Sequence, residues 1–274
     1  MPDGRAEDDH GRVQRPSLPP SLERADAAES LPRLGGMARP NGVVIVSERC
    51  WAFAGTDGSL RTGEMPATRR ALRHVPLVRG LVRLGASVSP LFRRSGVARP
   101  RERWLLVAAV LAPFAFVFLP ERVSLFAGLA ITAALITWML RGRTLHLHGA
   151  EHRAIAATEA RTLASTWRGD ARPSRFSPRC GTNFAALVLP VTFGFERLWV
   201  LPTAVFTPVA VTLVSLALTM ELWQLVQGST RRAAKAFLVP GLALQRLTTR
   251  EPSLDETRVA LAAVAAVLEL ERAH

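Results

Sequence analysis

The residues best suited to chemistry lie near the middle of the chain, in the string His148-Gly149-Ala150-Glu151-His152. The residues after it favour a helix, which would place His148 and His152 one turn apart on one face, about 6 Å along the axis. Two imidazoles at this spacing can bind the same divalent cation. Glu151 would then act as a general base on a metal-bound water, or as a ligand. The alternative is that the histidines only cap a helix or form hydrogen bonds.

A metal site needs at least three protein ligands, so a third must come from another segment. Cys180, in Pro178-Arg179-Cys180-Gly181-Thr182-Asn183, is the best candidate. Together with His148 and His152 it would form a Cys-His-His set with an open position, which suits zinc. The H-x-x-E-H order also occurs in one class of zinc protease, although five residues are a short match. A nucleophilic cysteine paired with histidine, or a buried inert thiol, are the alternatives.

Four other side chains are of types that could contribute to such a site. Glu159 lies seven residues after His152, about 10.5 Å further along a helix. It would support the site from outside, bind a second ion, or be a surface acid. Arg179 is available for an anionic substrate group or a lipid phosphate. His146 is less expected as a ligand, and Cys50 is expected to be inert.

Charge and hydropathy point to a lipid surface. The chain has 274 residues, with 35 Lys and Arg against 22 Asp and Glu, a net charge of +13. Such a charge implies an anionic partner. The apolar, charge-poor runs favour membrane lipids, and no nucleic-acid partner is predicted. Two cysteines exclude a cystine-rich class, and no phosphate-binding glycine loop or serine-hydrolase elbow is present.

The predicted fold class is mainly α: a helical integral membrane protein with about four apolar segments in two hairpins, a small N-terminal β-hairpin unit and cytoplasmic helices. Arginines flank both hairpins, which predicts a multi-pass inner-membrane protein with both termini in the cytoplasm. A soluble helical bundle with buried hairpins is the alternative. The apolar segments are Trp104–Leu119, Val123–Leu140, Phe184–Phe195 and Leu198–Met220, the third being re-entrant or a short span.

The organisation predicted from these patterns has six parts. They are a disordered tail (1–40), a β-hairpin with a basic amphipathic helix (41–100), a first transmembrane hairpin (101–143), a cytoplasmic connection with the histidines and Cys180 (144–183), a second transmembrane hairpin (184–223) and a cytoplasmic helical segment (224–274). An amphipathic helix is expected over Leu254–Glu271 within the last part.

Several of these motifs together resemble the YqhQ-like family of bacterial membrane proteins of unknown function. The stretches that carry the resemblance are Pro76-Leu77-Val78-Arg79-Gly80, His148 to His152, Pro178 to Phe184, Pro240-Gly241-Leu242 and Gln245 to Pro252. The resemblance implies an integral membrane protein and a predicted metal-dependent enzyme. The chain departs from the family pattern at Met37, Asn41, Val46, Ser177 and Arg258, where the family has other residues.

The sequence therefore predicts a membrane protein with a cytoplasmic-face site for a divalent metal ion, zinc first, and a hydrolase-like reaction. Its residues would be His148, His152 and Cys180 as ligands and Glu151 as base. A non-catalytic membrane scaffold with a structural metal or none is the rival hypothesis. The substrate is unknown and a homo-oligomer is left open.

Overall fold

The computed structural model describes residues 17–66, 74–92, 96–116, 118–139, 141–200 and 207–273. A four-stranded antiparallel sheet lies near its middle, in the order β1 (Gly35–Arg39), β2 (Gly42–Val46), β3 (Cys50–Gly55) and β4 (Leu60–Glu64). A turn at Asp57-Gly58 joins β3 to β4, and Gly58 has the positive φ of 81° that such a turn requires.

Both faces of the two central strands are buried. Successive side chains of a strand point to opposite sides, so each strand contributes residues to two separate cores. Val43, Ile45, Ala52 and Ala54 belong to the larger core, which includes α5 (Thr144–Ala160) and α11 (Leu254–Ala273). On the other face, Val44, Trp51 and Phe53 pack with Val97. The sheet is therefore an internal layer rather than a surface.

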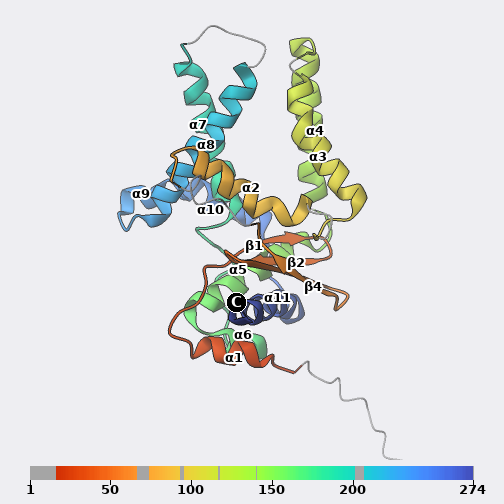
Figure 1. Ribbon diagram of the computed structural model, residues 1–274, viewed down its shortest axis with the longest axis vertical. Helices are drawn as coiled ribbons and strands as arrows, with labels where there is room; N and C mark the ends of the chain where they lie inside the picture. The colour runs from red at the N-terminus through yellow and green to blue at the C-terminus, as the bar shows by residue number, and fades with distance from the viewer. Residues whose placement is uncertain are drawn as a thin grey trace, which may run out of the picture.

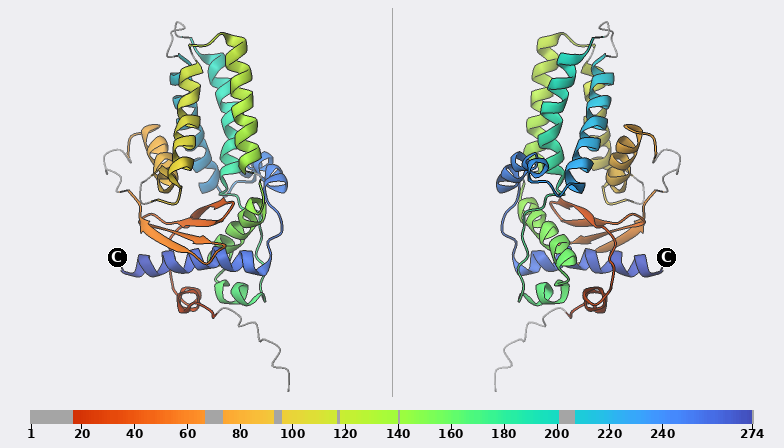
Figure 2. Two further views of the ribbon diagram at one scale, coloured as in Figure 1. Left: turned by 90° about the vertical axis from the view of Figure 1, so that its right-hand side faces the viewer. Right: turned by 90° about the vertical axis from the view of Figure 1, so that its left-hand side faces the viewer.

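Helices α5 and α11 pack against one another on one side of the sheet (Figures 1 and 2). Their facing residues are mostly small, including Ala150, Ala154, Ala260 and Ala263, all fully buried. The helix predicted to carry His148 and His152 is confirmed as α5. The amphipathic helix predicted over Leu254–Glu271 is confirmed as α11. Two short helices, α1 (Pro20–Asp26) and α6 (Leu163–Arg168), close the far side of this core.

On the opposite side of the sheet, two pairs of helices project from the molecule (Figure 2). One pair is α3 (Pro100–Phe116) and α4 (Glu121–Met139), and the other is α7 (Gly181–Leu198) and α8 (Thr207–Gly228). Helix α2 (Val78–Phe92) lies across their base (Figure 1). The short helices α9 (Arg232–Ala236) and α10 (Val239–Thr248) lie at the base on the opposite side from α2 (Figure 2).

Helix α2 is fastened to α8 by a contact that explains one of the sequence motifs. Arg79 donates two hydrogen bonds from Nε to the Glu221 carboxylate, at 2.8 and 3.0 Å. The backbone N–H of Leu77, a residue with a positive φ of 66°, donates to the same carboxylate. At Gly80 a Cβ would lie 2.8 Å from that of Met220, so only glycine permits this approach. The Pro-x-x-Arg-Gly motif thus belongs to this crossing.

The prediction of about four membrane-crossing segments is wrong. Within the described ranges, only α8 is long and apolar enough to cross a membrane, with a mean hydropathy of 1.7. A span needs about 20 apolar residues. Helix α3 has 17 residues and begins with a charged first turn, and α7 has 18 residues and ends with Glu196 and Arg197. The apolar part of α4, Arg122–Thr137, is also short.

One further boundary differs from the sequence prediction. The tail predicted over residues 1–40 contains helix α1 and strand β1. Leu22 of α1 and Leu34, which directly precedes β1, are buried in the main core. Residues 1–16 of that tail lie outside the described residues, as do 67–73 and 93–95 of the part (41–100) that was predicted to hold the basic amphipathic helix. A short helix and an edge strand need few large apolar residues to pack on a core. The composition of α1 and β1 therefore resembles that of a disordered tail.

Candidate metal centre

Three ligand-type side chains meet between α5 and the start of α7. His148 and His152 come from consecutive turns of α5, and Cys180 is the N-cap residue of α7. One ligand atom from each lies within 4.8 Å of the others, and His148 Nε2 is 3.2 Å from Cys180 Sγ. In the part of the chain that the structure describes, this is the one group of three or more such residues able to hold a metal ion.

Backbone carbonyls fix which nitrogen of each imidazole faces the cluster. The Nδ1 of His148 lies 2.8 Å from the carbonyl oxygen of Thr248, and the Nδ1 of His152 lies 2.6 Å from that of Arg175. A carbonyl only accepts, so each Nδ1 carries the proton and each Nε2 keeps its lone pair. The Nε2 of His152 is buried with no hydrogen-bond partner among the described residues. Metal-binding histidines are oriented in the same way.

The surroundings keep both imidazoles neutral. Burial lowers the pKa of His148, against the opposing effect of its hydrogen bond to Thr248. Burial, with the neighbouring His148, lowers the pKa of His152 to about 4. The two rings lie edge to face with centroids 4.4 Å apart. A metal ion binds neutral imidazole, so neither ligand would have to lose a proton at neutral pH.

Cys180 is held as a cap whose sulfur faces the histidines. The backbone N–H and the hydroxyl of Thr182 donate to its Sγ, at 3.4 and 3.2 Å. Burial, with the nearby Glu151, raises the pKa of the Cys180 thiol to about 11. The group is therefore a thiol in the absence of a cation. A bound cation stabilises the thiolate, as in other thiolate metal sites.

Glu151 lies beside this cluster in a cavity of about 260 Å³. The cavity is walled by β1, α5 and the segment around Cys180. Glu151 is 5% exposed, and its burial raises the pKa of its carboxyl to about 8. No residue in the described ranges forms a hydrogen bond with it. At Gly36 a Cβ would lie 2.8 Å from Glu151 Cγ, so glycine makes room for this side chain.

The last residue of α10 and the segment that follows it run along α5 and position it. Besides Thr248, Arg250 takes part, with its N–H donating to the carbonyl of Leu145 at 2.9 Å. A Cβ at Gly149 would lie 2.2 Å from the Arg250 oxygen. The glycine between the two histidines is therefore needed for the backbone contact that orients His148.

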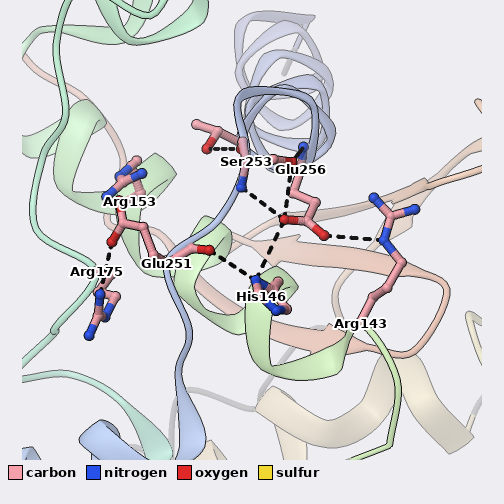
Figure 3. A network of polar contacts seen from close by, with 8 residues as sticks. Arg143, His146, Arg153, Arg175, Glu251, Ser253 and Glu256 are labelled. Carbon is pink, nitrogen blue, oxygen red and sulfur yellow. Dashed lines mark hydrogen bonds and ion pairs between the residues drawn. The ribbon is translucent and has the colours of Figure 1, made fainter.

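An ion-pair network secures the same segment at its end (Figure 3). The Glu251 carboxylate accepts hydrogen bonds from Arg153 at 2.6 Å and from Arg175 at 2.9 Å. Arg153 is nearly buried and also donates to the carbonyl of Pro173. Since the carbonyl of Arg175 holds His152, the Glu251 carboxylate links α5 to the loop that orients this imidazole.

The other predicted residues lie outside the cluster. Glu159 forms an ion pair with Arg179 near the end of α5. His146 is exposed, and its Nδ1 lies 2.9 Å from the carbonyl of Glu251. Cys50 is buried in β3. The structure therefore brings His148, His152, Cys180 and Glu151 together and leaves Glu159 and His146 at the edge.

Sequence reasoning missed the residues that shape the loop before Cys180. Gln245 is fully buried; its Oε1 accepts the N–H of Ser177, and its Nε2 donates to the Ser177 carbonyl. Asn183 donates to the carbonyls of Ser177 and Pro178. A Cβ at Gly241 would lie 2.2 Å from the Asn183 side chain. The signal that could have found them is their place in the stretches that carry the family resemblance.

This arrangement defines a class: a helical protein with an internal antiparallel sheet and a buried His-His-Cys group at the base of a helical pair. Residues 122–270, more than half of the chain, match the family described as "Protein of unknown function (DUF1385)". The chain belongs to this family.

One curated relative extends the comparison. Over 135 residues the chain is 32% identical to the "Uncharacterized protein YqhQ" of Bacillus subtilis (strain 168). The match covers 47% of this chain and 42% of the relative, so the chain spans less than half of that protein's length. No solved structure matches the chain.

Replacing Glu251 by glutamine should lower the free energy of unfolding at neutral pH by about 1 kcal/mol, because Arg153 and Arg175 lose their carboxylate. The hydrogen bond from Arg153 is the main cause that holds the pKa of Glu251 below its ordinary value. The ion pairs therefore stabilise the fold above the ordinary glutamate pKa, and the gain is lost as the pH falls through the lowered value.

Denaturant unfolding of the parent and the Glu251→Gln variant, at several pH values from neutral to acid, measures this difference. We expect it to be largest at neutral pH and to vanish in acid. Glu269→Gln, at an exposed position of α11, is the control. A difference that is constant with pH would contradict the assignment.

Proposed function

We propose that this protein binds one divalent metal ion, zinc first, between His148, His152 and Cys180 and uses it in a hydrolytic reaction. The observation that carries the proposal is the pair of imidazole Nε2 atoms, both unprotonated and turned toward a buried thiol. Two nitrogens and one sulfur form a donor set that suits zinc. A zinc ion bound there supplies Lewis acidity for hydrolysis.

The chain's own groups have defined tasks in this proposal. Glu151 lines the same cavity as the three ligands. A nearby cation favours its ionised form, and the carboxylate then accepts a proton there as the general base. The carbonyls of Thr248 and Arg175 orient the two imidazoles. Three protein ligands leave an open coordination position, which catalysis requires.

A non-catalytic site is the second candidate, and one departure from the family pattern favours it. Ser177 lines the cavity at the position where the resembling family has a histidine. If that histidine takes part in catalysis, this chain keeps a structural metal site and serves as a scaffold. The two candidates differ in whether the ion has an open position.

We also propose that α8 attaches the protein to the inner membrane, with the metal centre at the cytoplasmic face. Support comes from the length and hydropathy of α8. Large apolar side chains are exposed on its neighbours too, such as Leu189 and Phe193 of α7. Cys180 begins α7, so the centre lies at the base of this helical pair, and a reducing cytosol would keep the thiol free.

Metal analysis of the purified, detergent-solubilised protein tests the site. We expect about one zinc ion per chain in the parent and loss of the metal in a His148→Ala/His152→Ala variant, because two of three ligands are gone. His146→Ala is a matched control: this histidine is on the same helix but outside the cluster. A folded parent that binds no metal, even after divalent ions are added back, would sink the metal-site proposal.

Cobalt substitution separates an enzyme from a scaffold. Acetohydroxamate should change the visible spectrum of the cobalt-loaded parent, because it enters an open coordination position. Cys180→Ser should remove the thiolate-to-cobalt absorption, whereas Glu151→Gln should retain the metal. A spectrum that acetohydroxamate leaves unchanged would indicate a closed, structural site and would favour the scaffold.

Membrane attachment is tested by washing membranes with alkaline carbonate. The parent should stay in the pellet, and Leu213→Arg in α8 should reduce the retained fraction, because an arginine within a span costs about 3 kcal/mol. Leu213 is 42% exposed; Leu247 of α10 is 66% exposed, so Leu247→Arg serves as the control. Complete release of the parent would refute attachment through α8.

A further inference from the structure

A second cavity adjoins the candidate metal centre. It has a volume of about 310 Å³ and lies between the segment from Leu31 to Leu34 and the C-terminal end of α5. Leu34, Ile155 and Arg179 line both this cavity and the one that holds Glu151. A molecule that fills the second cavity would therefore lie next to the ligand cluster.

The second cavity is lined by three guanidinium groups and one carboxylate: Arg33, Arg161, Arg179 and Glu159. Glu159 is paired with Arg179. The remaining two guanidinium groups have no carboxylate partner in the described part of the chain. The cavity thus has an excess of positive charge, which favours an anionic ligand.

The two arginines without a carboxylate partner differ in how they are held. Arg161 is fixed, because its Nη1 donates to the carbonyl of Ala25 at 2.9 Å and its Nη2 to that of Glu29 at 3.1 Å. Neutral carbonyls hold its position and leave its charge in place. Arg33 is exposed and forms no hydrogen bond or ion pair with any described residue. One arginine is therefore preorganised beside the cavity, and another is free to close on a ligand.

Arg179 connects this charge to the metal centre. It precedes Cys180 in the chain, and its guanidinium is about half exposed at the junction of the two cavities. The planar fork of a guanidinium matches two oxygens of a phosphate as well as it matches a carboxylate. A phosphate group could therefore take the place of Glu159 as the partner of Arg179.

We propose that this second cavity binds the phosphate group of the molecule on which the metal centre acts. The statement that the metal centre acts on the bound molecule rests on the proposed hydrolytic function. The statement that the cavity binds phosphate does not. The phosphate can belong to a soluble molecule or to a lipid headgroup, since either presents the same oxygens to the arginines.

Calorimetric titration of the full-length protein in detergent, at constant ionic strength, tests the proposal. One arm uses inorganic phosphate, and the other uses phosphatidate in mixed micelles with phosphatidylcholine micelles as the blank. We expect saturable binding in at least one arm, and the stronger arm identifies the source. Arg33→Gln and Arg179→Gln should each weaken it about tenfold, because each removes a charge-assisted contact.

Arg231→Gln is the matched control, because it removes the same charge from an exposed position before α9, outside both cavities. Arg33→Lys keeps the charge and should restore part of the affinity. Arg33 is exposed, so its substitution should leave the thermal unfolding temperature unchanged. Failure of both arms to bind the parent would overturn the proposal, as would equal weakening in all three glutamine variants.

The same titration on His148→Ala/His152→Ala separates the two proposals. That variant lacks two metal ligands but keeps every arginine of the second cavity. Phosphate binding that persists in it supports the arginine cavity, whatever the metal analysis finds. Phosphate binding that needs the two histidines would contradict this cavity as the phosphate site, even when the parent contains zinc.

Discussion

The candidate site depends on one close backbone contact, between α5 and the segment that follows α10. Gly149 has no side chain, so the Arg250 carbonyl can approach α5 to a distance that any Cβ would block. That approach brings the carbonyl of Thr248 to the His148 ring and the N–H of Arg250 to Leu145. Residues about 100 positions apart in the chain are thereby fixed as one unit.

Glycine also permits close contacts at two other places around the site. Glycine at position 36 admits the Glu151 side chain, and glycine at position 241 admits Asn183. Asn183 and Gln245 then fix the backbone of the loop that presents Cys180. Gln245 forms hydrogen bonds through both its oxygen and its nitrogen, so a displacement of the loop would leave buried polar groups unsatisfied. The ligand cluster is thus supported mainly by hydrogen bonds to backbone atoms.

This support explains what the sequence could and could not reveal. Helical periodicity placed His148 and His152 on one face of a helix, and the need for a third ligand pointed to Cys180. The carbonyls that orient the rings carry no side-chain signal, so Arg175 and Thr248 could not be found. Hydropathy failed in another way: α3 and α7 have apolar composition, but their charged ends leave each apolar run shorter than a span. Composition sums over a segment, whereas crossing a membrane depends on continuous length.

The residues that line the site fall partly inside and partly outside the family match. All three ligand-type residues and Glu151 lie within residues 122–270, whereas β1, which closes the cavity, lies before them. Met37, one of the departures from the family pattern, belongs to that strand and lines the cavity. A change there alters the shape and polarity of the space around Glu151 without moving a ligand. Strand β1 therefore shapes the space beside Glu151 without supplying any of the three ligand-type side chains.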